Sequence, residues 1–158
     1  MSASLQTAER VGIFDGPYYL SIAGKLVGSA QTFDVINPAT AEVLAKAPSA
    51  AVEQLEEAIA AAKEAFRSWA AIGYDARQNH LNAYADALEL HHDELAHLLT
   101  QEQGKPLKTM AEPEVDQAIS WVRQIAARRI PIEIVENTDE HIVELHHTPL
   151  GVVGAITP

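Results

Sequence analysis

The residues best suited to bind a small molecule lie in the stretch Pro149–Pro158. Residues 150–156 are all apolar or glycine, which predicts a fully buried strand between the flanking prolines. Two glycines inside it indicate close approach of the backbone to a helix or to a ligand. Ligands of open α/β sheets bind at the carboxyl ends of the strands. That end holds the candidate binding residues Ile156, Thr157 and Pro158. A strand that simply ends there is the alternative.

Residues of metal-binding type do not form a recognisable site. The chain has seven histidines and no cysteine, so disulfides, Cys-zinc sites and Cys nucleophiles are excluded for this sequence. His91 and His92 are adjacent, so on a helix they point about 100° apart and cannot chelate one ion together. No His-Glu-x-x-His pattern is present. We therefore expect exposed histidines rather than a structural or catalytic zinc.

The remaining chemical motifs have ordinary structural interpretations. Gly104-Lys105 lacks the Gly-x-x-x-x-Gly-Lys spacing of a phosphate-binding loop. We interpret Gly104 as a helix cap and Lys105 as a solvated side chain. The Asp and Glu pairs of the helices lie on faces expected to be wet, so they are not acid–base pairs.

Short strands open the ordered part of the chain. Residues 18–23 and 26–27 predict a hairpin around Gly24. A second strand at 33–36 leads into a β-turn with Pro38 at its second position, and a third strand returns at 42–46. Together they predict a small antiparallel meander, which is too small to be stable alone.

Three helices follow the meander. Ser49 is a plausible N-cap for the first, which has one apolar stripe and ends at Gly73. Asp75 and Gln78 have the spacing of a capping box for the second, which should continue to Gly104.

The third helix carries Val115, Ile119, Val122 and Ile125 at helical spacing. Because an internal proline costs about 3 kcal/mol, this helix either begins near Pro113 or kinks there. Residues 130–135 and 141–147 predict two further extended segments.

Composition limits the class of protein. The 158 residues suffice for one ordinary domain, and 47% of them are hydrophobic. A net charge of −11 argues against nucleic acids and anionic membranes as partners. Residues 1–17 lack the long apolar block of a secretory signal, and no apolar run approaches the length of a membrane span. The expected location is therefore the cytoplasm.

Several segments together resemble the aldehyde dehydrogenase superfamily. Pro149–Pro158 is similar to the segment that opens the family's cofactor-binding domain. The other landmarks, in matching order and spacing, are residues 33–40, Ala65-Phe66 with Trp69, and residues 98–107. The resemblance runs from about Tyr18 onward and covers the amino-terminal third of a family member.

The resemblance implies an α/β fold and a domain division. Residues 1–17 would be a leader, and residues 18–140 the amino-terminal part of the cofactor-binding domain, made of the β meander and three helices. Residues 141–148 would be a strand of the oligomerisation type, which implies a homo-oligomer (dimer or tetramer). Residues 149–158 would be the first strand of a Rossmann-like dinucleotide-binding core that is truncated here.

The resemblance also implies ligands. The backbone around Ile156, Thr157 and Pro158 would line the site of NAD or NADP. In some family members a monovalent cation is held by two main-chain carbonyls and a carboxylate, which match Val35, Ile36 and Glu102. Oxygen ligands of this kind suit hard cations. The alternative for Glu102 is a solvated carboxylate at a helix end.

The function expected from the resemblance is oxidation of an aldehyde to a carboxylic acid. In the family a Cys thiolate attacks the aldehyde, hydride passes to the nicotinamide, and a Glu activates the water that releases the product. Neither residue can be placed in this chain, so we expect it to be inactive alone. Two alternatives are a non-catalytic assembly module, which would use its helices and the edge of strand 141–148, and a relic without function.

Overall fold

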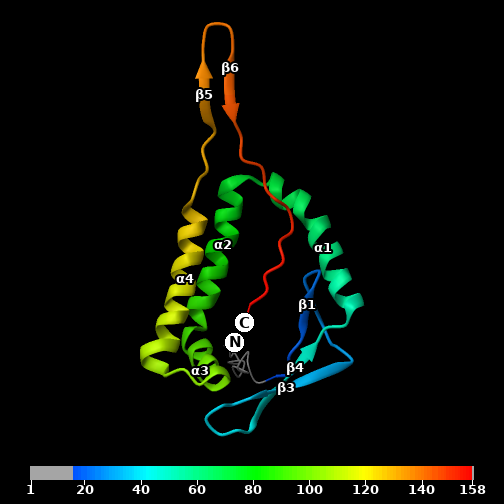
Figure 1. The fold of residues 1–158 in the computed structure, drawn as a ribbon. Helices are drawn as coiled ribbons and strands as arrows, with labels where there is room; N and C mark the ends of the chain where they lie inside the picture. The colour runs from blue at the N-terminus through cyan, green and yellow to red at the C-terminus, as the bar shows by residue number, and fades with distance from the viewer. Residues whose placement is uncertain (1–15, 158) are drawn as a thin grey trace, which may run out of the picture.

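A computed structural model describes residues 16–157 and has an α/β architecture, as expected. The strands are β1 Leu20–Ile22, β2 Lys25–Val27, β3 Gln31–Ile36, β4 Val43–Ser49, β5 Glu133–Asn137 and β6 Ile142–Leu145. The helices are α1 Val52–Ala71, α2 Gly73–Leu90, α3 His92–Gln103 and α4 Glu112–Ala127, with a π-helical turn η1 at Leu107–Ala111. In Figure 1, α2, α3 and α4 lie on one side, α1 and the first four strands lie on the other, and the closing segment runs between them in this view.

The first four strands form two separate hairpins, so the prediction of a single meander is wrong. Among residues 16–157, β1 pairs only with β2, and β3 pairs only with β4. The linker between the hairpins is hydrogen-bonded to helix α1. The Gln54 side-chain amide donates to the Gly28 carbonyl oxygen at 2.8 Å.

Helix α1 begins later than the sequence predicts. Ser49 is the last residue of β4, paired with Gln31, and is therefore not the N-cap. The backbone N–H of Ala51, just before the helix, instead donates to the Gln54 side chain at 3.1 Å. The break between α1 and α2 at Gly73 is confirmed, and Gly73 has a φ of +79° that favours glycine.

The predicted second helix is divided in two. His91, with φ −107° and ψ 19°, separates α2 from α3. The Asp75–Gln78 capping box is wrong, because both residues lie inside α2, which begins at Gly73. Their side chains instead accept hydrogen bonds from Arg129, at 2.9 Å and 2.8 Å. Helix α3 ends at Gly104 as predicted, with φ +78°.

Pro113 marks the beginning of α4, which confirms the first of the two alternatives for this residue. It is the second residue of α4 and lies in the first turn, where proline is tolerated best. Helix α4 follows directly on η1, whose last residue is Ala111.

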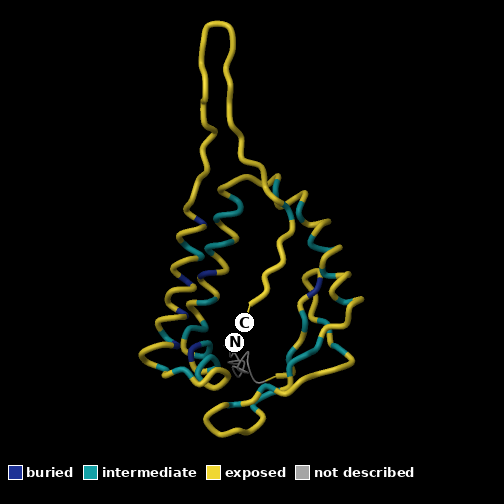
Figure 2. Tube along the Cα trace, viewed as in Figure 1, coloured by how far each residue is buried: buried dark blue, intermediate teal, exposed yellow. Residues whose placement is uncertain are grey.

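The core of the described residues is small and lies among the helices. The buried cluster comprises Ala85, Ala96, Ala111, Val115 and Ile119. Ala85, Ala96 and Ala111 have no exposed surface, and their small side chains let α2, α3 and η1 approach α4 closely. Outside this cluster most of the chain is exposed, as Figure 2 shows.

The last two strands form a hairpin that projects beyond the helices (Figure 1). β5 and β6 pair antiparallel, with a register shift between Ile134 and Glu136. Every residue of both strands is exposed.

The closing segment is not the buried strand that the sequence predicts. Residues 149–157 have no regular secondary structure, and Leu150 and Ile156 are 98% and 101% exposed. A strand requires a hydrogen-bonded neighbour, and none of the described strands pairs with this segment. Apolar composition alone therefore did not decide its structure.

Candidate ligand-binding site

A concave surface lies between strand β4 and helix α3, and we call it the β4–α3 groove. It consists of two cavities of about 950 Å³ and 220 Å³. Tyr18, Leu44, Ala45 and Leu98 line both cavities, so the two are parts of one groove. Its polar side chains come from β3, β4 and α3, and from Tyr18 just before β1.

Hairpin β3–β4 positions the strand side of the groove. Val35 pairs with Ala45, and the register shifts between Val35 and Ile36. Such a bulge bends the strand locally. The turn beyond it is closed by backbone hydrogen bonds: the Asn37 N–H donates to the Glu42 carbonyl at 2.9 Å, and the Ala41 N–H donates to the Asn37 carbonyl at 2.8 Å.

The end of α3 is held against this turn by a close contact. A Cβ atom added to Gly104 would lie 2.9 Å from Cγ of Pro38, so only glycine fits there without movement. Gly104 also closes the helix, because its N–H donates to the Thr100 carbonyl oxygen at 2.8 Å. The contact explains why Glu102, two residues earlier, lies near β3.

The structure brings together two of the three residues predicted to bind a cation. Val35 and Glu102 both line the smaller cavity. Ile36 pairs with Val43 beyond the bulge and is 45% exposed, and it is not among the residues that line this cavity. Glu102 itself is exposed.

The charged groups around the larger cavity already have partners. Lys46 Nζ lies 2.5 Å from Asp34 Oδ1, and His91 Nδ1 lies 3.0 Å from Glu94 Oε2. His97 also lines this cavity and is exposed. The groove thus presents oxygen and nitrogen atoms to a ligand.

The predicted cofactor residues do not form an enclosed site among the described residues. Ile156 and Thr157 are exposed, and Pro158 lies outside the described part of the chain. Nothing lies within 4 Å of a Cβ built on Gly151 or Gly154, so no close backbone approach occurs there. Within the described residues, 149–157 therefore form a mostly exposed segment without regular secondary structure.

The histidines do not converge on a metal site within residues 16–157. No group of three or more His, Cys, Asp or Glu side chains in this part could hold an ion. One histidine nevertheless has a role that the sequence did not predict, because His92 contacts carboxylates of two different helices. The only sequence signal is the neighbouring Asp93; the second partner, Asp116, is distant in sequence.

A search of the helices within residues 16–157 found none with the length and apolar composition of a membrane span.

Comparisons with known proteins identify relatives along most of the chain. The sequence model of the aldehyde dehydrogenase family matches residues 26–158. A probable aldehyde dehydrogenase from a Pseudomonas species is 39% identical over 151 residues, which are 94% of this chain and 31% of that protein. The chain therefore spans less than a third of that relative's length.

Solved structures show the same relationship. A point mutant of betaine aldehyde dehydrogenase from Staphylococcus aureus, in complex with NAD+, is 30% identical with a TM-score of 0.70, over 76% of this chain and 25% of that one. A 3,6-anhydro-L-galactose dehydrogenase in complex with NAP is 28% identical with a TM-score of 0.72, over 80% of this chain and 28% of that one.

Proposed function

Because the chain belongs to the aldehyde dehydrogenase family, we propose that it forms the amino-terminal part of an enzyme that oxidises an aldehyde to a carboxylic acid with NAD or NADP. The observation that carries this proposal is the continuous family match from residue 26 to residue 158. Relatives with solved structures bind NAD+ in one case and NAP in another, which supports a nicotinamide dinucleotide as hydride acceptor.

Within such an enzyme this chain would contribute structure rather than the nucleophile. The 158 residues contain no cysteine, and the family resemblance implies a Cys thiolate as the attacking group. The helical core would support the closing segment, whose backbone is exposed and open to a ligand or a neighbouring strand. Bound dinucleotide would supply the oxidising power. Residues Ile156, Thr157 and Pro158 are the proposed contacts to it.

The decisive experiment is to read the gene beyond codon 158 and to assay both products. We expect the reading frame to continue and to supply a Cys and a Glu. The longer protein should reduce NAD or NADP with a panel of aldehydes, and the 158-residue chain should not. A stop codon directly after Pro158, or normal turnover by the 158-residue chain, would overturn the proposal.

The proposal extends to a monovalent cation near Val35, Ile36 and Glu102. The support is that Val35 and Glu102 line one cavity of about 220 Å³. If the carboxylate and the strand carbonyls bind Na+ or K+, these ions should raise the urea midpoint of the chain more than choline at equal ionic strength, because binding to the folded state stabilises it. Glu102→Gln should remove that difference. Equal midpoints in all three salts would exclude the site.

A second candidate function is self-assembly through the β5–β6 hairpin. The hairpin projects from the helices, and it exposes Ile134, Val135 and Ile142 by 61%, 67% and 60%. Exposed apolar strands with free edges are pairing sites. A homo-oligomer formed through this hairpin, which includes most of residues 141–148, is therefore part of the proposal.

A further inference from the structure

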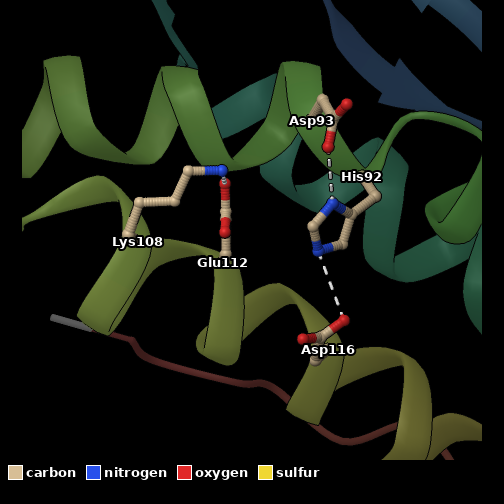
Figure 3. A network of polar contacts seen from close by, with 5 residues as sticks. All are labelled: His92, Asp93, Lys108, Glu112 and Asp116. Atoms are coloured by element: carbon tan, nitrogen blue, oxygen red, sulfur yellow. Dashed lines mark hydrogen bonds and ion pairs between the residues drawn. The ribbon is translucent and has the colours of Figure 1, made fainter.

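His92 lies where three helical elements meet, and both of its ring nitrogens face carboxylates (Figure 3). It is the first residue of α3, directly after the break at His91. Its Nδ1 lies 2.9 Å from Asp93 Oδ1 in the same helix. Its Nε2 lies 3.2 Å from Asp116 Oδ1 in α4. The imidazole thus joins the start of α3 to α4.

The geometry identifies the protonation state that this arrangement requires. A neutral imidazole has one N–H and one acceptor nitrogen, and an ionised carboxylate can only accept. With a carboxylate at each nitrogen, only the doubly protonated ring satisfies both contacts. The Nε2 atom is fully buried, and its contact with Asp116 is too poorly aligned to count as a hydrogen bond. Charge attraction is therefore the main force of that contact.

The groups that face His92 come from three elements. Asp93 in α3 and Asp116 in α4 are the direct partners, and the main chain of Glu112 also helps to raise the pKa of His92. The Glu112 side chain is neutralised by Lys108 of η1 at 2.6 Å. His97 of α3 acts on Asp93 through space.

The net effect of these groups favours the charged ring. The hydrogen bond to Asp93 is the largest cause of the raised pKa of His92, and desolvation opposes it more weakly. The charges of Asp116 and Asp93 add to the increase. Reciprocally, the hydrogen bond from His92 lowers the pKa of the Asp93 carboxyl below its usual 3.8.

We propose that His92 is a pH-dependent clamp, which holds the start of α3 against α4 while its ring is doubly protonated and releases it when the ring loses a proton. Release would loosen α3, whose residues Leu98 and Glu102 form one wall of the β4–α3 groove. The proposal is independent of the proposed oxidoreductase function.

The direction of the pH dependence follows from the raised pKa. The clamp's contribution to stability should be complete below the usual pKa of 6.5, and it should be lost as the pH rises through the higher pKa of the folded state. Asp93 contributes in the opposite sense, since its stabilisation is present above pH 3.8 and is lost on further acidification.

The first test is an NMR titration of the imidazole nitrogens in the unmodified 158-residue chain. We expect His92 to carry protons on both nitrogens at a pH of 6.5, with a titration midpoint above that value. A single neutral tautomer at this pH, with a midpoint at or below 6.5, would overturn the proposal. This measurement needs no variant and so does not depend on a variant folding.

The second test is amide hydrogen exchange of α3 on both sides of the titration. Protection of the first turns of α3 should fall by about twofold to fivefold above the His92 midpoint, the range expected for ion pairs of modest strength. Asp116→Asn should lower the midpoint and reduce that change, and His92→Gln should abolish it.

The matched control is His80→Gln, which removes an exposed imidazole from α2, away from the groups that face His92. It should preserve the fall in protection. If Asp116→Asn leaves the His92 midpoint unchanged, or if His80→Gln abolishes the effect as His92→Gln does, the clamp is excluded.

Discussion

At the scale of single residues, Gly104 offers the sharpest prediction about the candidate site. Gly104→Ala would place a Cβ 2.9 Å from Pro38 and force alanine to adopt a φ of +78°. A left-handed conformation costs alanine about 1–2 kcal/mol, and a tight contact of this kind adds about 1–3 kcal/mol. We therefore expect a clear fall in the urea midpoint, measured by circular dichroism, and a change in the NMR signals of residues 37–41.

Gly73 provides the matched control, because its φ of +79° is nearly the same but nothing lies within 4 Å of its Cβ position. Gly73→Ala should lower the free energy of unfolding only by the cost of the left-handed backbone conformation. The less flexible unfolded chain should offset about 0.4–1 kcal/mol of that cost. The difference between the two variants isolates the contact with Pro38. Equal losses of stability would show that α3 is not held against the β3–β4 turn.

The same scale shows where sequence reasoning about individual polar residues succeeds and fails. Gly73 and Gly104 were predictable, because a positive φ at a helix boundary strongly favours glycine. Asp75 and Gln78 have a spacing that fits a cap, yet both bind Arg129, which is more than fifty residues away along the chain. A local pattern cannot reveal that a distant guanidinium competes for the same oxygens.

At the scale of elements, the projecting hairpin predicts a self-associating chain. Val135→Asp would place a carboxylate among the exposed apolar side chains of β5, where pairing with a second copy would desolvate it. We expect sedimentation equilibrium to show association of the unmodified chain. The variant should dissociate at concentrations at least about tenfold higher, a difference of roughly 1.4 kcal/mol.

Val52→Asp is the control for this experiment, because Val52 of α1 is 68% exposed and Val135 is 67% exposed. Both variants add one negative charge to a chain that already carries −11, so general repulsion changes equally. If both weaken association alike, the hairpin has no special role. A chain that stays monomeric at every concentration would remove the basis of the assembly candidate.

The elements also show how much of the fold the spacing of apolar residues can predict. Apolar spacing predicted α1 and α4, because one face of each pattern repeats along the helix. The extended segments predicted at 130–135 and 141–147 overlap β5 and β6, but their pairing was not predicted. It did not predict the break at His91, where the apolar positions continue from α2 into α3. It was wrong for residues 149–157, since a strand depends on a neighbour that local sequence does not specify.

At the scale of the whole molecule, the chain exposes far more surface than a compact protein of its mass. Its accessible surface is 12693 Å². A compact monomer of 17.1 kDa would expose about 7,700 Å². The excess includes large apolar residues. Trp121 of α4 is 60% exposed, and Leu150 and Ile156 of the closing segment are 98% and 101% exposed. The candidate groove and hairpin thus belong to a framework with a small core.

This open framework predicts weak cooperativity for the 158-residue chain. An unfolded chain of this mass exposes about 24,800 Å², so folding buries about 12,000 Å² here, against about 17,000 Å² for a compact protein. Because the urea m-value scales with the area exposed on unfolding, we expect an m-value about 30% below that of a compact monomer of equal length. Exposed apolar surface should also bind the dye ANS under native conditions. A sharp transition with a full m-value, together with no ANS binding, would mean that the chain closes its apolar surfaces in solution, by compaction or by association; sedimentation of the same sample would then separate these two outcomes.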